Sequence, residues 1–474
     1  MTEENNCNNK GFIKEWLPKI IVGAVSFTIF MIIHLINVSS RHIAVAFKVP
    51  DYNIGIYFSK LYGIRGISVF FGSLLEYIIN YYGFAKRESL SFFSFCIIFF
   101  VRFAFLMCLY VSDQLSIHGY TILSLEAFFF GVFQMSYFSL VSHHISIAIV
   151  FLDLSSLIIT IIQALFDLCM FDEPLMILKS HAWLSILFTL GSVGGWYYYL
   201  FHADCTKSHP KDTCPPENKE KESEFKCLNF NKYEYRKDIY KYRGKKRFKH
   251  HLNKVLYLFF LLIIAFFFMN ILYPGVLPYG LLDRDECHLI NLFIPVSLLL
   301  GSLSIYLMNT FWCDFNKKYP TSVHVFLILL VPLIFIAIYS IGALHIEEFH
   351  ARSIKGSRTI VLLLTLSLLF CCNVLQSLSY VGISNYVKKA GVSPETLAVL
   401  TFHNLMANVF RYFTSKVAVG YTTCRVENEY ALKVFHPTYR MNPIECTCFW
   451  VGESCRRAYK DILNDFKLDI DKYV

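Results

Sequence analysis

The stretch ILSLEAFFFGVFQMSYFSL, Ile122–Leu140, decides the class of fold. A helix needs about 20 apolar residues to cross the hydrocarbon core of a bilayer, and this run is close to that length. It nevertheless carries an amide, Gln134, and a hydroxyl, Ser136, among its aromatic and aliphatic side chains. Polar groups at such depth are costly unless they find partners or serve a function. The stretch therefore predicts a membrane-spanning helix with a polar side chain of special purpose.

Similar apolar runs recur along the whole chain of 474 residues, of which 55% are hydrophobic and 17% charged. The mean hydropathy is +0.47, whereas a soluble domain has about 25% charged residues. We therefore expect an all-α polytopic membrane protein embedded in the lipid bilayer. The first apolar run, Leu17–Leu35, is too long for a cleavable signal peptide.

Eleven spans are predicted, with a long hydrophilic stretch, Asp204–His251, between the sixth and the seventh. They are Leu17–Asn37, Ile56–Tyr81, Ser91–Val111, Thr121–Ser142, Ser146–Phe171, Ala182–Leu200, Val255–Tyr279, Leu289–Phe311, Val323–Leu344, Thr359–Tyr380 and Thr396–Val419. This spacing predicts a 6+5 two-bundle arrangement. Its parts are an N-terminus (1–16), a six-helix bundle (17–203), a basic loop (204–252), a five-helix bundle (253–420) and a Cys-containing tail (421–474).

The basic residues predict the orientation of the chain, because Lys and Arg concentrate in cytoplasmic loops. Phe84–Glu88 and the basic run Lys241–His251 fall on one side, and Arg352–Arg358 is the main exception. We expect a cytoplasmic N-terminus, an external or lumenal C-terminus, and the plasma membrane rather than an internal one. The net charge of +9 is thereby explained without a nucleic acid polymer as partner.

The tail carries an even number of cysteines on the side predicted to be oxidising. We expect disulfides there, and the candidates are Cys424, Cys446, Cys448 and Cys455. No CxxC pair accompanies them, so no metal is predicted.

Ionisable and amide side chains inside the spans suggest a polar interior. The charged candidates of greatest interest are Arg102 in the third span and Asp153 in the fifth; Arg65, Glu76, Glu126, Asp167, Arg411 and Lys416 complete the set. Hydrogen bonds between helices and a path for a solute both remain open as explanations. In the seventh span Pro274, Gly275 and Pro278 predict a break in the helix, with a kink near its end as the plainer alternative.

No catalytic motif is present, and neither an enzyme activity nor a cofactor is predicted. The pair His143 and His144 leaves open a membrane-embedded enzyme as a minor alternative.

Several short motifs resemble the equilibrative nucleoside transporter family. Gly131–Leu140 resembles its fourth span, Phe100–Phe103 the arginine of the third, and Tyr273–Val276 the Phe-Pro-Gly/Ala segment of the seventh. Phe293–Val296 and Val392–Phe402 resemble segments of the eighth and last spans. The eleven-span layout is also that of the family. The similarity covers most of the chain from the third span onward.

The resemblance implies a facilitative transporter of nucleosides or nucleobases that works by alternating access, with a small-molecule solute as partner. Gln134, with Ser136 nearby, would face the base. Asp314 would accept hydrogen bonds from ribose, and Lys318 would hold Asp314. Arg102 would be a structural or gating charge, with Asp153 as its possible partner, and the Pro274–Pro278 segment would flex. The oligomeric state is not implied.

The chain also departs from the family pattern. It lacks the Pro-Trp-Asn of the first span and the Gly-Gln-Gly that follows the fourth, and Lys318 stands where the family has an arginine. Lysine cannot make the planar bidentate contact of arginine. These departures favour an alternative: a lineage-specific membrane protein that keeps the scaffold without transport and acts through its loops and tail.

Overall fold

The computed structural model describes residues 2–50, 54–169, 173–202, 243–282, 284–311, 323–345, 353–391, 393–429 and 441–465. Within these ranges the chain is built from helices and turns, without strands. The apolar runs explain this, because a helix satisfies all its backbone hydrogen bonds internally and so tolerates a bilayer.

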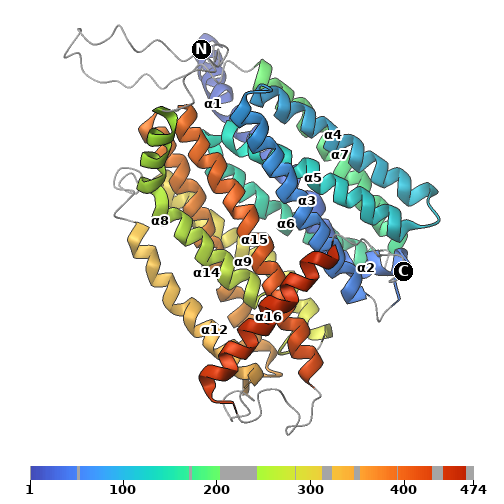
Figure 1. Cartoon of the computed structure of the whole chain (residues 1–474). Helices are drawn as coiled ribbons and strands as arrows, with labels where there is room; N and C mark the ends of the chain where they lie inside the picture. The colour runs from blue at the N-terminus through green and yellow to red at the C-terminus, as the bar shows by residue number, and fades with distance from the viewer. Residues whose placement is uncertain are drawn as a thin grey trace.

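The first half of the chain forms one group of long helices, coloured blue to green in Figure 1. They are α1 (Thr2–Val38), α3 (Ile54–Tyr82), α4 (Arg87–Val111), α5 (Leu115–Leu140), α6 (Ile145–Cys169) and α7 (Pro174–Phe201). A short helix, α2 (Ser40–Ala46), follows α1, and a single turn, η2 (Ser142–His144), joins α5 to α6. We call this group the first bundle.

The second half forms a second group, coloured yellow-green to red in Figure 1. Its elements are α8 (Arg243–Leu272), α9 (Arg284–Phe311), η5 (Val323–Leu329), α12 (Leu330–His345), α14 (Arg358–Ala390), α15 (Pro394–Glu429) and α16 (Pro443–Asp465). We call this group the second bundle.

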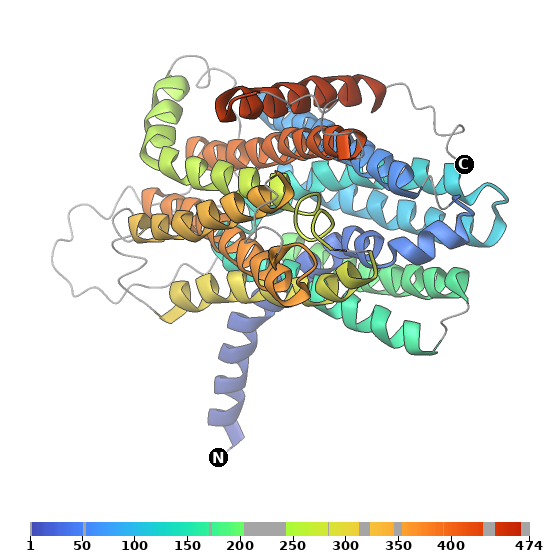
Figure 2. The same ribbon diagram turned by 90° about the horizontal axis from the view of Figure 1, so that it is seen from below.

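The two bundles lie side by side in both ribbon views (Figures 1 and 2). Helices α3 and α5 pack against α15, while α6 packs against α9 and α14. We call this contact the seam. It brings together residues that are more than 200 positions apart in the sequence, such as Asp153 and Asn373.

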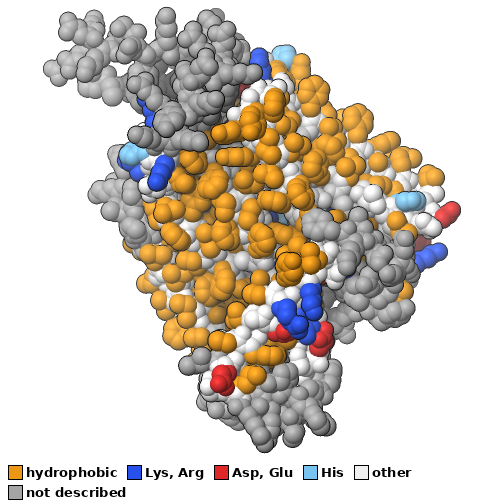
Figure 3. All heavy atoms as spheres, viewed as in Figure 1, with side chains coloured by type: hydrophobic (Ala, Val, Ile, Leu, Met, Phe, Trp, Pro, Cys, Tyr) orange, Lys and Arg blue, Asp and Glu red, His pale blue; other side chains and the backbone are white. Residues whose placement is uncertain are grey.

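Ten helices in the described residues are long and apolar enough to cross a membrane. They coincide with the first ten predicted spans, and the eleventh corresponds to α15, whose polar residues lower its hydropathy. Large apolar side chains such as Phe100 (65% exposed) and Ile338 (63%) cover the outer surface. Figure 3 shows this apolar surface over most of one face of the molecule. A lipid environment accounts for such an exterior, whereas water does not.

Helices α3 and α5 cross at unusually short distance because each has a glycine at the crossing. A Cβ on Gly72 would overlap the carbonyl oxygen of Phe128, and a Cβ on Gly131 would overlap that of Val69. Small residues at such positions let two backbones approach closely in a membrane. Gly131 lies three residues before Gln134, so this crossing fixes the position of the amide.

Helix α16 was not predicted, because the tail from residue 421 was expected to carry disulfides rather than a long helix. It packs against α15 and crosses it obliquely (Figure 1), and the two backbones approach closely where Gly420 meets Ser454. Lys416 Nζ lies 2.6 Å from Asp461 Oδ2, and the ring of Tyr421 lies 5.9 Å from that of Trp450. Charged side chains gather over this helix in Figure 3, on a face that is otherwise apolar.

The four tail cysteines lie on α15 and α16, and all four are free thiols in the structure. Disulfide pairing among them stays a prediction. Nearby, Glu453 accepts hydrogen bonds from Arg456 and Arg457, which hold the pKa of its carboxyl below the usual value.

Candidate functional site

Arg102 pairs with Glu126 and not with Asp153, which corrects the sequence-based pairing. Its Nη2 lies 3.0 Å from Glu126 Oε1, and the other carboxylate oxygen lies 3.0 Å from Nη2 of Arg65. Glu126 is on α5, which packs directly against α3 and α4, whereas Asp153 on α6 faces the second bundle. The side chains of Arg65, Arg102 and Glu126 are all buried.

The other hydrogen bonds of Arg102 stay within the first bundle. Its guanidinium donates to the carbonyl oxygens of Thr28 (2.9 Å) and Ile29 (3.0 Å) on α1 and to the hydroxyl of Thr189 (2.9 Å) on α7. Arg102 thus ties α1, α4, α5 and α7 together. Arg102 was predicted to be a structural or a gating charge. This geometry supports the structural role, since none of these contacts crosses the seam.

Gln134 lies at the seam and is 6% exposed. Asn408 on α15 turns its Nδ2 toward Gln134 Oε1 at 3.5 Å and donates to Ser73 Oγ at 2.9 Å. The amide oxygen of Gln134 is thus within reach of the opposite bundle. Its amide nitrogen has no hydrogen-bond partner among the residues that the structure describes.

Ser136 belongs to a different contact from Gln134. It is fully buried, and its hydroxyl donates to Glu76 Oε1 at 3.0 Å inside the first bundle. Arg87 Nε lies 3.3 Å from the same oxygen. The structure therefore does not bring Ser136 together with Gln134 and Asn408.

Asp153 joins the two bundles at the seam. Its Oδ2 accepts a hydrogen bond of 2.8 Å from Nδ2 of Asn373 on α14, and the carboxyl group is 4% exposed. A buried carboxylate is tolerated where polar partners compensate for the lost water. Asp153 is thus a seam residue, although its partner is an amide and not Arg102.

Arg411 is the functional candidate that sequence reasoning noticed but left without a role. It lies in the middle of α15 and is exposed, although Phe266 beside it is buried. Its guanidinium carbon lies 5.1 Å from the centre of the Phe266 ring. Asp153 on α6, Tyr380 on α14 and His34 on α1 are close enough to interact electrostatically with it. An arginine within a predicted span was the available signal.

The remaining predicted residues lie elsewhere. Asp314 and Lys318 fall outside the described residues, so their roles stay predictions. Helix α8 ends at Leu272, before Pro274, so the seventh span is shorter than expected and residues 273–281 form turns beyond it. In these turns a Cβ on Gly275 would overlap Oγ1 of Thr422 on α15.

The seam therefore contains three polar groups: the amides of Gln134 and Asn408, the carboxylate of Asp153 with the amide of Asn373, and the exposed guanidinium of Arg411. These residues, Gln134, Asn408, Asp153, Asn373 and Arg411, come from both bundles and lie more than one turn from either end of their helices. Such a set can donate and accept hydrogen bonds and carries both signs of charge. It suits a small polar solute held between two bundles.

Comparison with known proteins shows a likeness of fold. No family model and no curated protein matches the chain. Among solved structures, a bacterial homologue of the iron transporter ferroportin in its outward-facing state has a TM-score of 0.51 at 12% identity, covering 95% of this chain and 98% of that one. An auto-inhibited POT family peptide transporter has a TM-score of 0.53 at 13% identity, with 96% and 97% covered. The human organic anion transporter MFSD10 has 0.51 at 11%, with 94% and 99% covered.

At these identities the likeness concerns the fold alone. The chain has an all-α, major-facilitator-like transporter fold over nearly its whole length, in agreement with the predicted two-bundle arrangement. The solved structures do not single out the equilibrative nucleoside transporter family.

Proposed function

We propose that this chain is a facilitative membrane transporter that moves nucleosides or nucleobases by alternating access. The observation that carries the proposal is the seam, where polar side chains of both bundles meet inside helices that are otherwise apolar. In transporters of inverted or parallel repeats, substrate sites lie near the bilayer midplane between the two halves. The transporter fold of the chain supports the same class of function.

Gln134 is the residue proposed to read the base. An amide donates and accepts at once, as does the edge of a purine or pyrimidine. Its nitrogen is without a partner among the described residues, so a base can bond there while Asn408 stays near the oxygen. This proposal keeps Asp314 as the acceptor for ribose hydroxyls and Lys318 as the group that holds Asp314, and it adds Arg411 as an exposed charge at the seam.

The proposal includes the setting of the transporter. It places the protein in the plasma membrane rather than in an internal one. The distribution of Lys and Arg favours a cytoplasmic N-terminus and an external or lumenal C-terminus.

Uptake of radiolabelled adenosine and hypoxanthine into cells that express the chain tests the proposal. We expect uptake above background for the wild type and a loss of at least about tenfold for Gln134→Ala, the cost of about 1.4 kcal/mol or more of substrate contact. Gln114→Ala removes an amide from an exposed position between α4 and α5 and should transport normally. Background uptake of both solutes by the wild type, with surface expression verified, would contradict the proposal.

A second candidate is a scaffold that does not transport. Several seam contacts are complete within the protein: the hydroxyls of Ser139 and Thr401 lie 3.1 Å apart, and Ser384 donates to the carbonyl oxygen of Ser142. Such contacts also suit a static assembly. Absence of uptake for a wider panel of polar solutes would favour it. The enzyme alternative would instead require that His143→Ala/His144→Ala abolish a lipid-modifying activity.

A further inference from the structure

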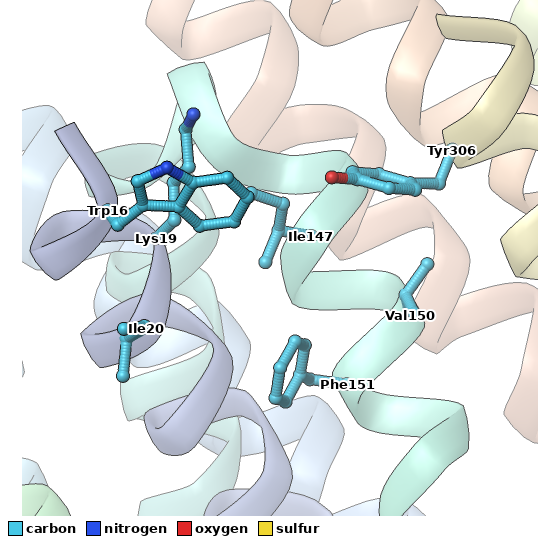
Figure 4. A pocket seen from close by; sticks show the side chains of 7 residues that line it. All are labelled: Trp16, Lys19, Ile20, Ile147, Val150, Phe151 and Tyr306. Atoms are coloured by element: carbon cyan, nitrogen blue, oxygen red, sulfur yellow. The ribbon is translucent and has the colours of Figure 1, made fainter. Parts of the chain in front are cut away.

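We propose that a groove at one end of the seam binds an anionic phospholipid, with an acyl chain between the bundles and the headgroup at a cluster of basic side chains. The groove has a volume of about 140 Å³ and lies between α1 and α6 of the first bundle and α9 of the second. Figure 4 shows its lining side chains. This inference concerns the lipid around the protein and does not depend on the transported solute.

The walls of the groove are apolar and open to the surface. Ile20 is 57% exposed, and Ile147, Val150 and Phe151 present the adjacent side of α6. The ring of Phe151 lies close to Gly23, where a Cβ would meet it at 3.0 Å, so this ring packs against the backbone of α1. An apolar groove on a lipid-facing surface is filled by acyl chains, because water there would leave its hydrogen bonds unmade.

The rim of the groove carries the side chains that mark a membrane interface. Trp16 and Tyr306 flank it, and the hydroxyl of Tyr306 points toward Ile147 (Figure 4). Lys19 Nζ lies 4.8 Å from the centre of the Trp16 ring. Tryptophan and tyrosine favour the headgroup level, where one side of the ring is apolar and the other is wet. The rim is therefore at the depth of phospholipid headgroups.

A cluster of basic groups at this end supplies the charge complementarity. Lys19, His143 and Lys388 all lie near enough to His144 for their charges to act on it. They come from α1, η2 and α14, so the cluster spans both bundles. Lys388 and His143 are exposed. This end is the predicted cytoplasmic one, and anionic lipids concentrate in that leaflet, where basic pockets between helices bind their headgroups.

The occupant is thus an anionic glycerophospholipid and not free phosphate, because an acyl chain can bind in the apolar groove and free phosphate has no such group. A lipid in this position touches α6 and α9 at once and so bridges the two bundles. A zwitterionic lipid fits the groove equally well but gains less from the lysines.

Native mass spectrometry of the full chain in detergent with defined lipids tests the proposal. With equal amounts of phosphatidylserine and phosphatidylcholine, we expect preferential retention of phosphatidylserine by the wild type. Each basic side chain near an anionic surface is worth about 1 kcal/mol, or about fivefold in affinity. Lys19→Gln/Lys388→Gln should therefore lower the preference by at least about fivefold, while Lys19→Arg/Lys388→Arg should keep it.

Two further variants separate this site from general surface charge. Lys86→Gln removes an exposed cation from the loop between α3 and α4, at the same predicted end, and should leave the preference unchanged. Val150→Phe narrows the groove and should reduce retention of both lipids. The proposal is wrong if the wild type shows no preference, if Lys86→Gln lowers it as much as the double variant, or if inorganic phosphate displaces the bound lipid. Size-exclusion profiles verify that each variant is folded.

Discussion

At the scale of single residues, the carboxylate of Glu126 holds together two buried arginines. It lies 3.0 Å from Arg65 and from Arg102, and its side chain is 2% exposed. Removing one partner of a buried ion pair leaves an uncompensated charge, which costs about 3–5 kcal/mol. We therefore expect Glu126→Gln to lower the melting temperature of the purified protein strongly, as measured by intrinsic fluorescence in detergent.

Asp113→Asn is the matched control for Glu126→Gln, because it removes one carboxylate from an exposed position between α4 and α5. Its melting temperature should equal that of the wild type. Equal melting temperatures for both variants would contradict the structural role of the Arg65–Glu126–Arg102 triad. The position of Gln134 depends on the same helix, so loss of uptake in Glu126→Gln alone would not identify a substrate contact.

At the scale of helices, the crossing of α3 and α5 depends on Gly72 and Gly131. A methyl group at either position would overlap a backbone carbonyl of the opposite helix, and backbone cannot move aside as a side chain can. Overpacking of this kind typically costs about 1–3 kcal/mol. Gly131→Ala should therefore lower thermal stability, whereas Gly191→Ala on α7 should not, because nothing lies within 4 Å of its added carbon. An equal change in melting temperature for Gly131→Ala and Gly191→Ala would contradict the close crossing of α3 and α5.

The same scale includes the attachment of α16 to α15 by Lys416 and Asp461. Lys416 is 4% exposed, so without the carboxylate at 2.6 Å its ammonium would be buried without that charge partner. We expect Asp461→Asn to loosen α16, seen as faster amide hydrogen exchange across Pro443–Asp465. Lys460→Gln, an exposed change on the same helix, should leave exchange there unaltered. Unchanged exchange in Asp461→Asn would show that other contacts hold the helix.

At the scale of the whole molecule, the spans were predictable because their signal is local. The third predicted span, Ser91–Val111, lies within α4, which begins only four residues earlier. Hydropathy does not give the rotation of a helix about its axis. The sequence therefore suggested Asp153 as the partner of Arg102, whereas the structure has Glu126. Helix α16 was missed for a related reason: it is amphipathic and not uniformly apolar, and its partner Lys416 lies in another helix.

The candidate site was predictable only in part. Gln134 was identified because an amide in an aromatic stretch is conspicuous, but its neighbour Asn408 is 274 residues away. Arg411 was visible in the sequence without any sign that it is exposed beside the buried ring of Phe266. Contacts across the seam arise from packing of the two bundles, which a single sequence does not reveal.

Alternating access requires that the two bundles move against each other, and cross-links across the seam test this motion. The hydroxyls of Ser139 on α5 and Thr401 on α15 lie 3.1 Å apart, so Ser139→Cys/Thr401→Cys places two thiols on opposite bundles. Thr28→Cys/Ser192→Cys places two thiols within the first bundle, where the native hydroxyls are 2.7 Å apart. We expect oxidation to arrest solute uptake in the first variant, with recovery after reduction, and to leave the second unaffected. Continued uptake through a protein whose seam is demonstrably cross-linked would show that the bundles do not separate at this end.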